Sequence, residues 1–479
     1  MSLSLHKDSH TFLYQQVIDL VREMQRSDAL KAGDKLPSLR SLATKLSVSV
    51  PTIKQAYIEL EQQGLIYARE KSGYYLKALE PNAVSPTKSK LAKKPVPVTR
   101  QQLIEQVYQG IHQAGNLPLG VANPVATMPA SKALNRAMRR VMSVAGDRAF
   151  QYGPTQGYEP LRQQLAMRYL DHGLQVNADE IVITNGAQEA ICLALQAVAK
   201  PGDVIAVETP CYFGILELIE SLDMLAFEIP LCADESISIA DIEGAVDQHD
   251  IAAVVLSSSI ANPMGCWLSN SKKKEIVRLL ESRNIPLIED DVYGELYFGS
   301  ERGLPAQVFS KKNMVLTCSS FSKTAAPGYR IGWVLAPGFA DKVGRCKRAF
   351  SCSAPLLNQW TITEYMRSGE YDRYIRHLRQ VLQTNKDRMV SLVRESFGPN
   401  VLVSDPKGGA VLWLEFDRAI DGDELFQAAL AKQISISPGS LFSPINRFKH
   451  CIRISYSLPW CEQVEQGVKT LASLVKEMG

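Results

Sequence analysis

Four short apolar runs that alternate with helical patterns constrain the fold of this chain most strongly. They lie at residues 181–184, 204–207, 253–256 and 285–288. Continuous apolar runs of this length are typical of parallel strands that are buried on both faces by helices. The pattern therefore predicts an α/β sheet. Ligand sites in such sheets lie beyond the carboxyl ends of the strands, so the residues that follow each run are the first candidates for function.

Length and composition limit the class of protein. A chain of 479 residues is too long for one ordinary core, so two or three domains are expected. The hydrophobic content of 46% and the charged content of 22% are those of a globular protein. No apolar run approaches the roughly 18 residues of a membrane span, and no signal-peptide region is recognisable. The nine cysteines form no Cys-x-x-Cys pair, which argues against a disulfide framework or a zinc ribbon and makes the cytosol the expected compartment.

The charge is distributed unevenly along the chain. Residues 1–100 hold 16 Lys/Arg against 9 Asp/Glu, and the other 379 residues hold 37 against 41. A basic front end on a mildly acidic body indicates a polyanionic partner for the front end. Much of the excess lies in residues 81–100, which contain four prolines, five basic residues and no acid. This segment cannot bury enough apolar surface to fold alone and is predicted to be a linker.

The N-terminal part shows helix, helix, turn, helix and hairpin patterns in that order. Apolar residues at helical spacing fill residues 11–27, and Ser38 is a suitable N-cap for a short helix that ends at Leu46. Ser49 or Thr52 can cap the next helix, and two short alternating runs near residues 65–68 and 74–76 follow. This order is that of a winged helix-turn-helix.

A lysine placed among hydroxyl groups is the clearest chemical signal. Lys323 follows Ser320 and Ser322, and Arg330 comes seven residues later. Apolar runs before and after this segment indicate strands. Hydroxyls and a guanidinium can hold a phosphate dianion while the amine attacks an aldehyde, so the set suits a Schiff-base lysine whose bound aldehyde carries a phosphate. A solvated surface lysine is the alternative.

Candidate residues also follow the other strands. Ala187 and Gln188 open a helix directly after one strand, where free backbone N–H groups can bind a phosphate. Tyr212 can stack on a flat ring, and the Asn262 amide can bond a phenolic oxygen. Taken singly, each has an ordinary structural alternative: a strand-to-helix turn, core packing for Tyr212, and a plain turn at Asn262.

Three consecutive acids at 289–291 are a sharper signal, because acids directly after an apolar strand are costly to bury unless they are paired. A carboxylate that faces a pyridine nitrogen would keep that nitrogen protonated, and Tyr293 could reach the phenolic oxygen of the same ring. A metal site is the competing interpretation. However, no histidine lies near in the sequence, and the seven histidines make no ligand spacing, so no metal is expected.

Arg453 lies inside an alternating run late in the chain. An arginine that points inward there could bind a carboxylate bidentately. An internal salt bridge is the alternative.

Together these motifs, in this order, make residues from about 115 to 475 resemble the fold-type I pyridoxal-phosphate aminotransferases. The resemblance implies Lys323 as the internal-aldimine lysine, Asp290 as the partner of the pyridine nitrogen, and Arg453 as the site for the α-carboxylate. It implies that Tyr152 contacts the cofactor phosphate that is bound in the partner subunit, so a homodimer is expected. The other implied cofactor contacts are Ala187, Gln188, Tyr212, Asn262, Tyr293, Ser320, Ser322 and Arg330.

The first 77 residues resemble the GntR-type winged helix. The resemblance implies double-stranded operator DNA as a partner, with Ser49, Thr52 and Lys54 facing the major groove. It implies further DNA contacts from Ser38, Arg40 and Lys71. Many relatives carry an arginine after the serine at position 49, whereas this chain has Val50 and Pro51. Pro51 suits a first helical turn, but the missing arginine is expected to change the choice of operator.

The two halves and their linker look like the MocR subfamily of GntR regulators. The expected fold is an all-α winged helix-turn-helix (1–79), a basic linker (80–112) and an α/β/α fold-type I aminotransferase-like domain (113–479). This domain has a large subdomain at about 150–345 and a smaller α+β subdomain.

The first functional hypothesis is a cytoplasmic regulator that binds pyridoxal 5'-phosphate and senses an amino compound or the cofactor, with residual transamination possible. The second is a working aminotransferase with an accessory DNA-binding module. The third is a DNA-binding protein with a purely structural body. We favour the first, because a metabolic enzyme needs no recognition helix.

Overall fold

The computed structural model describes ten segments of the chain and divides it into two compact units. The first unit contains the N-terminal residues up to Val84, and the second contains nearly all the rest. None of the described helices is long and apolar enough to cross a membrane. The described segments are residues 12–26, 33–62, 65–69, 72–76, 89–98, 101–113, 115–232, 236–299, 301–445 and 447–478.

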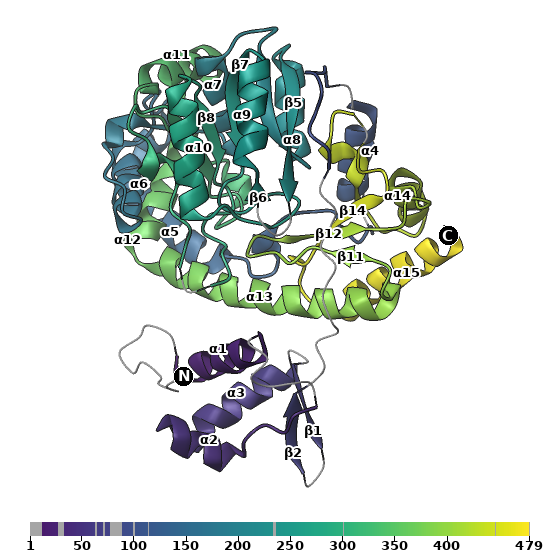
Figure 1. Cartoon of the computed structure of the whole chain (residues 1–479). Coiled ribbons are helices and arrows are strands. Elements are labelled where there is room, and N and C mark those ends of the chain that lie inside the picture. Colours follow the sequence, from purple (N-terminus) through teal and green to yellow (C-terminus); the bar gives the residue numbers. More distant parts are fainter. Residues whose placement is uncertain are drawn as a thin grey trace. The chain divides into compact units, whose positions relative to one another are not determined.

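The first unit is a three-helix bundle with a β-hairpin (Figure 1). Its elements are α1 (Leu13–Arg26), α2 (Leu39–Leu46), α3 (Val50–Gln62), β1 (Ile66–Arg69) and β2 (Gly73–Leu76). A small core of Val17, Ile18, Ile53, Tyr57 and Leu60 joins the helices. These apolar residues recur at helical spacing, so one face of each helix is buried. The predicted order of helices and hairpin is confirmed.

A mixed eight-stranded sheet forms the centre of the second unit, in the order β3-β10-β9-β8-β7-β4-β5-β6. Strands β9, β8, β7, β4 and β5 are parallel to one another, whereas β10 is antiparallel to both β3 and β9. The strands are β3 (Ile181–Thr184), β4 (Val204–Thr209), β5 (Leu225–Cys232), β6 (Ser236–Ile237), β7 (Ile251–Leu256), β8 (Leu287–Asp290), β9 (Val315–Ser320) and β10 (Gly332–Leu335).

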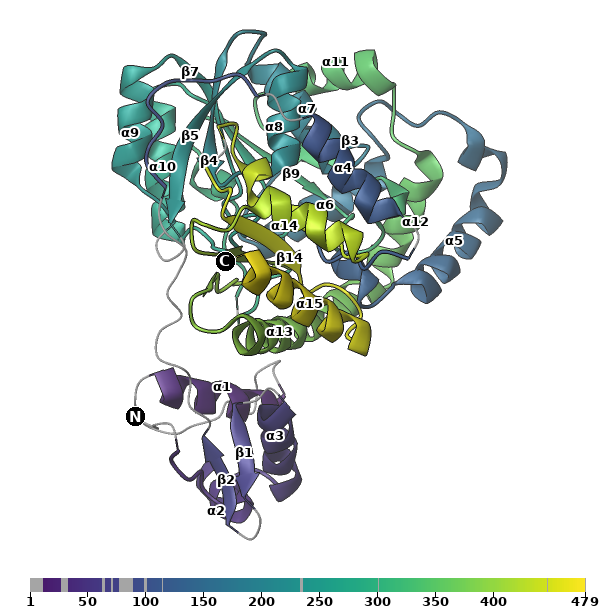
Figure 2. The ribbon, with the colours of Figure 1, turned by 90° about the vertical axis from the view of Figure 1, so that its right-hand side faces the viewer.

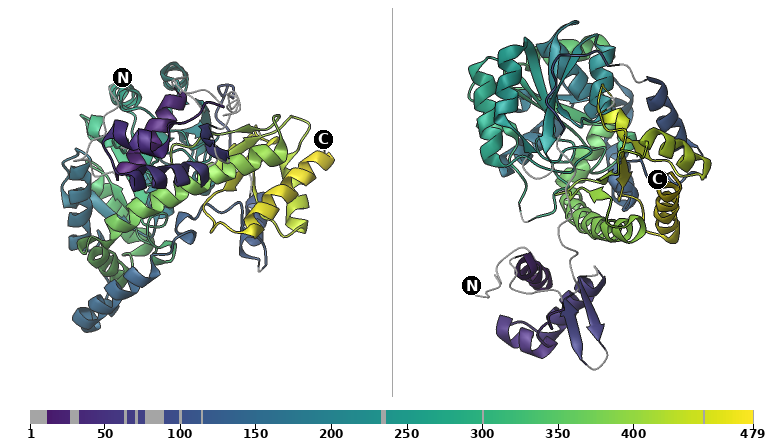
Figure 3. Two further views of the ribbon diagram at one scale, coloured as in Figure 1. Left: turned by 90° about the horizontal axis from the view of Figure 1, so that it is seen from below. Right: turned by 45° about the vertical axis from the view of Figure 1, so that its right-hand side comes forward.

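Helices cover both faces of this sheet, as expected for strands that are buried on both sides (Figure 3). Helix α7 contributes Ala190, Ile191 and Ala194 to a core that includes buried residues from β3, β4, β7, β8 and β9. The helices of this part are α5 (Ser131–Ala145), α6 (Glu159–Asp171), α7 (Ala187–Val198), α8 (Phe213–Ser221), α9 (Ile239–Gln248), α10 (Asn270–Ser282), α11 (Ala340–Ser351) and α12 (Leu356–Arg367).

A smaller subdomain is built on a four-stranded antiparallel sheet in the order β11-β12-β14-β13. The 28-residue helix α13 (Glu370–Phe397) runs from the large subdomain to the small one (Figure 1). The other elements are β11 (Leu402–Val403), β12 (Val411–Glu415), α14 (Gly422–Ala431), β13 (Ser437–Pro438), β14 (Cys451–Ser455) and α15 (Glu462–Met478).

Two details differ from the sequence predictions. The fourth apolar run is predicted at 285–288, but β8 spans Leu287–Asp290, so the strand itself carries Asp290 to its carboxyl end. Part of the segment 80–112, predicted to be a linker, is structured. Residues 101–112 form α4 (Gln101–His112), and Val96 forms a bridge with Ala226 of β5. The apolar residues Ile104 and Val107 are buried, and that burial offsets the cost of ordering this segment.

Candidate functional site

Lys323 lies in the turn after β9, beyond the carboxyl end of that strand. Its Nζ donates a hydrogen bond of 2.5 Å to the Ala122 carbonyl. Burial lowers the pKa of Lys323 to about 8, Arg453 and Arg330 lower it as well, and Asp290 opposes them. A lysine amine attacks a carbonyl only when it is neutral, so this environment makes Lys323 a better nucleophile than a surface lysine.

The start of α7 and Arg330 form a cradle for an anion. Arg330 Nη2 donates to the Asn185 carbonyl (2.9 Å), and Arg330 Nη1 lies 3.5 Å from the Ser322 hydroxyl. Gly186 caps the helix with φ +86°, and a Cβ at this position would lie 2.5 Å from Arg330 Nη2. Only glycine fits both the backbone conformation and this close approach. Backbone N–H groups at a helix start and a guanidinium are the groups that bind a phosphate.

The predicted phosphate contacts are brought together here, with one difference in detail. Ala187 and Gln188 open α7, Ser320 is the last residue of β9, and Ser322 directly precedes Lys323 in the turn. However, Gln188 Nε2 donates to the Gly214 carbonyl (2.6 Å), which ties α7 to α8. Its backbone N–H, rather than its side chain, is therefore the group expected to face a phosphate.

The three acids at the end of β8 have different surroundings. Glu289 is buried and accepts bonds from the Ser258 hydroxyl, the Thr317 hydroxyl (2.9 Å) and the Ala306 N–H (2.9 Å). Asp291 pairs with Arg302. Burial raises the pKa of Asp290 to about 6, against the effects of the Val292 N–H and of Lys323. Asp290 is therefore the acid of the three that interacts with the lysine, while the other two hold the strand end in place.

A phenol and an amide complete this side of the site. The Tyr293 hydroxyl is buried and has no hydrogen-bond partner among the described residues. Such an unpaired buried hydroxyl is costly, and a ligand oxygen would satisfy it. Asn262 Oδ1 accepts a 2.9 Å bond from Arg453.

Arg453 points inward from β14 and is 3% exposed. It donates to Asn262 Oδ1, to the Gly120 carbonyl (2.7 Å) and to the Ser437 hydroxyl (3.1 Å). In the part of the chain that the structure describes, no carboxylate pairs with it, and burial lowers its pKa. The salt bridge that was the alternative for this residue is therefore not found among the described residues. A buried charge without a counter-charge is costly, and an anionic ligand would remove that cost.

Tyr212 precedes α8, and its ring lies close to the backbone of Gly214, where a Cβ would be 2.6 Å from the ring. Burial raises its pKa, and so does the neighbouring Tyr108. Tyr108 comes from α4, and its ring packs edge-on against Phe213, which also contacts the Tyr212 ring.

Sequence reasoning missed three contributors to the site. The carbonyl groups of Gly120 and Ala122 leave no signal in a sequence, because every residue has one. Tyr108 falls in the segment that was predicted to be a linker, so its aromatic side chain was not considered. The signal in the sequence was the helical spacing of the apolar residues Ile104, Val107 and Tyr108, of which the first two are buried.

Tyr152 lies on the surface and is 91% exposed. It lines an open hollow of about 340 Å³ together with Asn185, whose carbonyl accepts from Arg330. Within the described residues of this chain, no hydrogen bond ties its side chain to the cradle.

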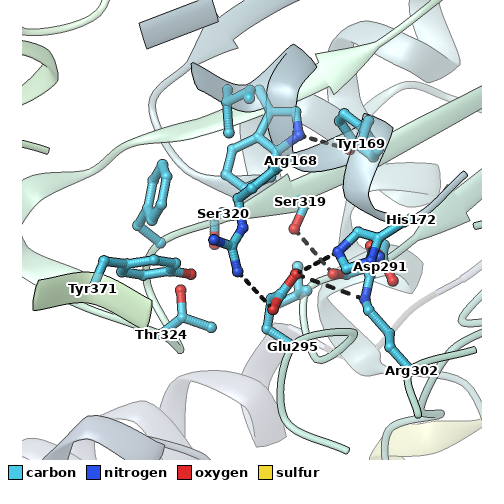
Figure 4. Close-up of a pocket in the computed structure, with 14 residues that line it drawn as sticks. Arg168, Tyr169, His172, Asp291, Glu295, Arg302, Ser319, Ser320, Thr324 and Tyr371 are labelled. Atoms are coloured by element: carbon cyan, nitrogen blue, oxygen red, sulfur yellow. Dashed lines mark hydrogen bonds and ion pairs between the residues drawn. The ribbon is translucent and has the colours of Figure 1, made fainter. Parts of the chain in front are cut away.

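Behind the lysine turn lies a small cavity of about 20 Å³ lined by charged side chains (Figure 4). Arg168 pairs with Glu295 (2.9 Å) and Asp372 (2.6 Å), and His172 lies 3.2 Å from Glu295. Burial would raise the pKa of Glu295, but Arg168 and other neighbouring cations hold it well below its usual range. Ser319, Ser320 and Thr324 also line this cavity. The network therefore supports both ends of the turn that carries Lys323.

The predicted DNA contacts lie on α2 and at the start of α3, except for Lys71, which lies outside the described residues. Ser38 caps α2 by accepting from the Ser41 N–H (3.2 Å). Ser49 precedes α3 and bonds to the Thr52 hydroxyl (2.7 Å) and N–H (3.3 Å). Arg40 and Lys54 are exposed. Ser38 and Ser49 therefore have capping roles that do not need DNA.

One group of possible metal ligands occurs among the described residues. Ligand atoms of Glu415, His450 and Cys451 lie within 4.8 Å of one another. The His450 ring nitrogen lies 3.4 Å from the Glu415 carboxylate, so the two side chains can satisfy each other without an ion.

Comparisons with known proteins cover both units. Residues 13–76 match the bacterial regulatory proteins of the gntR family, and residues 115–471 match the aminotransferase class I and II family. The uncharacterized HTH-type transcriptional regulator YdcR of Escherichia coli is 37% identical over 97% of this chain and 99% of its own length. The HTH-type transcriptional regulator NorG of Staphylococcus aureus is 28% identical over 93% of this chain and 100% of its own length.

Solved structures resemble the second unit. The α-aminoadipate aminotransferase LysN of Thermus thermophilus, complexed with N-(5'-phosphopyridoxyl)-L-leucine, has a TM-score of 0.73 and is 25% identical. The match covers 78% of this chain and 95% of that structure. The kynurenine aminotransferase of Pyrococcus horikoshii, in complex with PMP, has a TM-score of 0.72 and is 25% identical, over 79% of this chain and 95% of that structure.

Proposed function

Because this chain belongs to the GntR regulators that carry a class I and II aminotransferase domain, the MocR-type architecture, we propose that it is a DNA-binding transcriptional regulator that senses an amino compound. Its aminotransferase domain indicates pyridoxal 5'-phosphate as the cofactor. The single observation that carries the proposal is the pairing of Lys323, with its lowered pKa, and the buried, unneutralised Arg453 in one site.

The residues of the site fit this cofactor. Its phosphate would lie at the start of α7, held by Arg330 and by the hydroxyls of Ser320 and Ser322. Asp290 would face the ring nitrogen, and the unpaired Tyr293 hydroxyl would meet the phenolic oxygen. When bound, the cofactor supplies an aldehyde that reacts with amines and a ring that withdraws electrons. The protein supplies orientation and charge.

Arg453 determines the class of effector that we expect. A carboxylate would replace the Gly120 carbonyl and the Ser437 hydroxyl as partners of its guanidinium, and would neutralise it. The ligand would then carry an amine at one end, directed to the cofactor, and a carboxylate at the other. An amino acid carries both groups.

The visible absorption spectrum tests the cofactor part of the proposal. We expect a yellow band in the purified protein or after addition of pyridoxal phosphate, and loss of that band in Lys323→Ala. Lys274→Ala is the matched control, because Lys274 is an exposed lysine on α10. A colourless protein that stays colourless with added cofactor would refute the proposal, and the domain would then be a structural body.

The winged unit supports the DNA-binding part. Lys54 is exposed near the start of α3, the second helix of the helix-turn-helix. We propose that it enters the major groove of operator DNA. Selection from a random duplex pool would identify the operator, and Lys54→Ala should weaken binding to it by about 1–3 kcal/mol. Unchanged affinity relative to Lys274→Ala would exclude Lys54 from the interface.

A second candidate function is transamination, with the DNA-binding unit as an accessory module. The observation that favours it is the same lowered pKa of Lys323, since a neutral lysine is also the base that a transaminase needs. Conversion of an added amino acid to its keto acid over many turnovers, with an added 2-oxo acid as the acceptor of the amino group, would favour this function. A shift of the visible band without turnover would favour sensing.

We also propose that the protein acts in the cytoplasm as a homodimer. Its exposed apolar residues include Val144 (88% exposed), Phe150 (76%) and Tyr152 (91%), and exposed apolar clusters of this kind mark association surfaces. In the proposed dimer Tyr152 reaches the cofactor phosphate of the partner subunit. Light scattering should give the mass of a dimer, and Tyr152→Phe should weaken cofactor binding without changing that mass.

A further inference from the structure

Helix α4 is attached to the small subdomain. Gln427 Nε2 of α14 donates a 2.9 Å bond to Gln106 Oε1. A Cβ at Gly110 would lie 3.1 Å from Leu430 of α14, so the two helices lie close together (Figure 2). The absence of a side chain at Gly110 allows this close packing. Helix α4 is therefore a fixed part of the small subdomain rather than a segment of a loose linker.

From this position Tyr108 reaches across to the large subdomain. Its ring packs edge-on against Phe213 of α8, with ring centroids 6.1 Å apart. Phe213 in turn contacts the Tyr212 ring, with ring centroids 5.0 Å apart, and the Arg453 guanidinium, whose carbon lies 5.8 Å from the centre of the Phe213 ring. The Tyr108 side chain is 41% exposed.

The segment after α4 continues into the same site. The Leu117 N–H donates to Gln433 O (2.7 Å), and the Gly120 N–H donates to Ser435 O (2.7 Å), which fixes this segment against the small subdomain. The Gly120 carbonyl then accepts from Arg453, and the Ala122 carbonyl accepts from Lys323. Residues between the start of α4 and Ala122 thus contact Phe213, Arg453 and Lys323.

We propose that Tyr108 is a positioning residue of the effector site, which holds Tyr212 in place and closes the carboxylate end around Arg453. The proposal rests on the proposed function. The ligand class that it selects is an amine that carries a carboxylate.

Two aminooxy reagents test this without knowledge of the natural effector. Both form a new C=N bond to the cofactor carbon while the bond to Lys323 breaks and the lysine leaves as a free amine, which changes the visible absorbance. Aminooxyacetate carries a carboxylate and methoxyamine does not. The ratio of their rate constants therefore measures how much binding of the reagent's carboxylate accelerates the reaction. The reactivity of the cofactor carbon that is bonded to Lys323 affects both rate constants and cancels in the ratio.

In the wild-type protein we expect aminooxyacetate to react faster than methoxyamine. Tyr108→Ala should reduce the ratio about 2- to 10-fold, because it removes the ring that packs on Phe213. Tyr108→Phe keeps this ring and should reduce the ratio less. Gln109→Ala, an exposed neighbour on α4, is the control and should leave the ratio unchanged. The methoxyamine rate should stay the same in all variants.

The outcomes separate this proposal from the one on which it rests. A wild-type protein that forms no coloured complex with pyridoxal phosphate would refute the proposed function, and this inference with it. A coloured complex whose rate ratio is the same in wild type, Tyr108→Phe and Tyr108→Ala would refute the role of Tyr108 alone. An equal loss of both rates would mean that Tyr108 supports the fold of the whole site, which also overturns the proposal.

Discussion

The charges around Lys323 predict how the attachment of the cofactor depends on pH. Burial, Arg453 and Arg330 lower the pKa of Lys323 from 10.5 to about 8, and Asp290 counteracts them in part. Only the neutral amine attacks an aldehyde. At pH 7 an amine with a pKa of about 8 is roughly one-tenth neutral, whereas an ordinary lysine is neutral in about one molecule in 3,000. The site therefore provides about 300-fold more reactive amine.

Stopped-flow absorbance after mixing cofactor-free protein with pyridoxal phosphate measures this directly. The rate constant should rise with pH and level off, with a midpoint near pH 8. Two variants should move the midpoint in opposite directions. Arg453→Met removes a positive charge and should raise it, and Asp290→Asn removes a negative charge and should lower it.

The lowered pKa of Lys323 also affects the free energy of unfolding. In the cofactor-free protein Lys323 binds fewer protons when folded than when unfolded between about pH 8 and 10.5. Stability should therefore rise with pH across this window, by about 3 kcal/mol from this group. A rate midpoint near 10.5 in the wild type, or shifts of the same sign in both variants, would refute the electrostatic reasoning.

Three further predictions concern other parts of the chain. Gly186→Ala should weaken cofactor binding in an absorbance titration, because the new Cβ would clash with the Arg330 guanidinium and the backbone φ of +86° disfavours alanine. Gly328→Ala is the control and should not weaken binding, because the space around Gly328 is open. Arg302→Met should lower stability by about 3–5 kcal/mol in urea unfolding, because it leaves Asp291 buried without its partner; a change below about 1 kcal/mol would contradict a buried pair. Ser38→Ala should destabilise the winged unit by about 1 kcal/mol through loss of the α2 cap, measured by hydrogen exchange of the first turn of α2, and unchanged exchange would contradict the capping role.

Local patterns were sufficient to predict the order of the elements and the chemistry at the strand ends. The hydrophobic periodicity of residues 11–76 predicted three helices and a hairpin, because each element must bury one face. Asp290 and Lys323 were selected as candidates because the sequence places them just after predicted strands, where a parallel sheet brings functional groups to one edge. These inferences need only the sequence near each residue.

Other features depended on contacts between distant parts of the chain. Sequence could not distinguish the three acids at 289–291, since their roles follow from partners such as Ser258 and Arg302, which come from other elements. Nor could it exclude a salt bridge for Arg453, because that depends on every carboxylate that the fold could bring near. Helix α4 lies in the segment 80–112 that was predicted to be a linker, and its packing depends on α14, which is far from it in the sequence.

The sequence alone therefore determined which two kinds of domain this protein contains and which residues are candidates for its chemistry, because periodicity and motifs are local properties. The tertiary structure decided which charges are neutralised and which are not. It tied Asp291 to Arg302, left Arg453 without a counter-charge among the described residues, and placed the Ala122 carbonyl on Lys323. The physical reason is that the cost of a buried charge depends on neighbours that only the folded chain brings together.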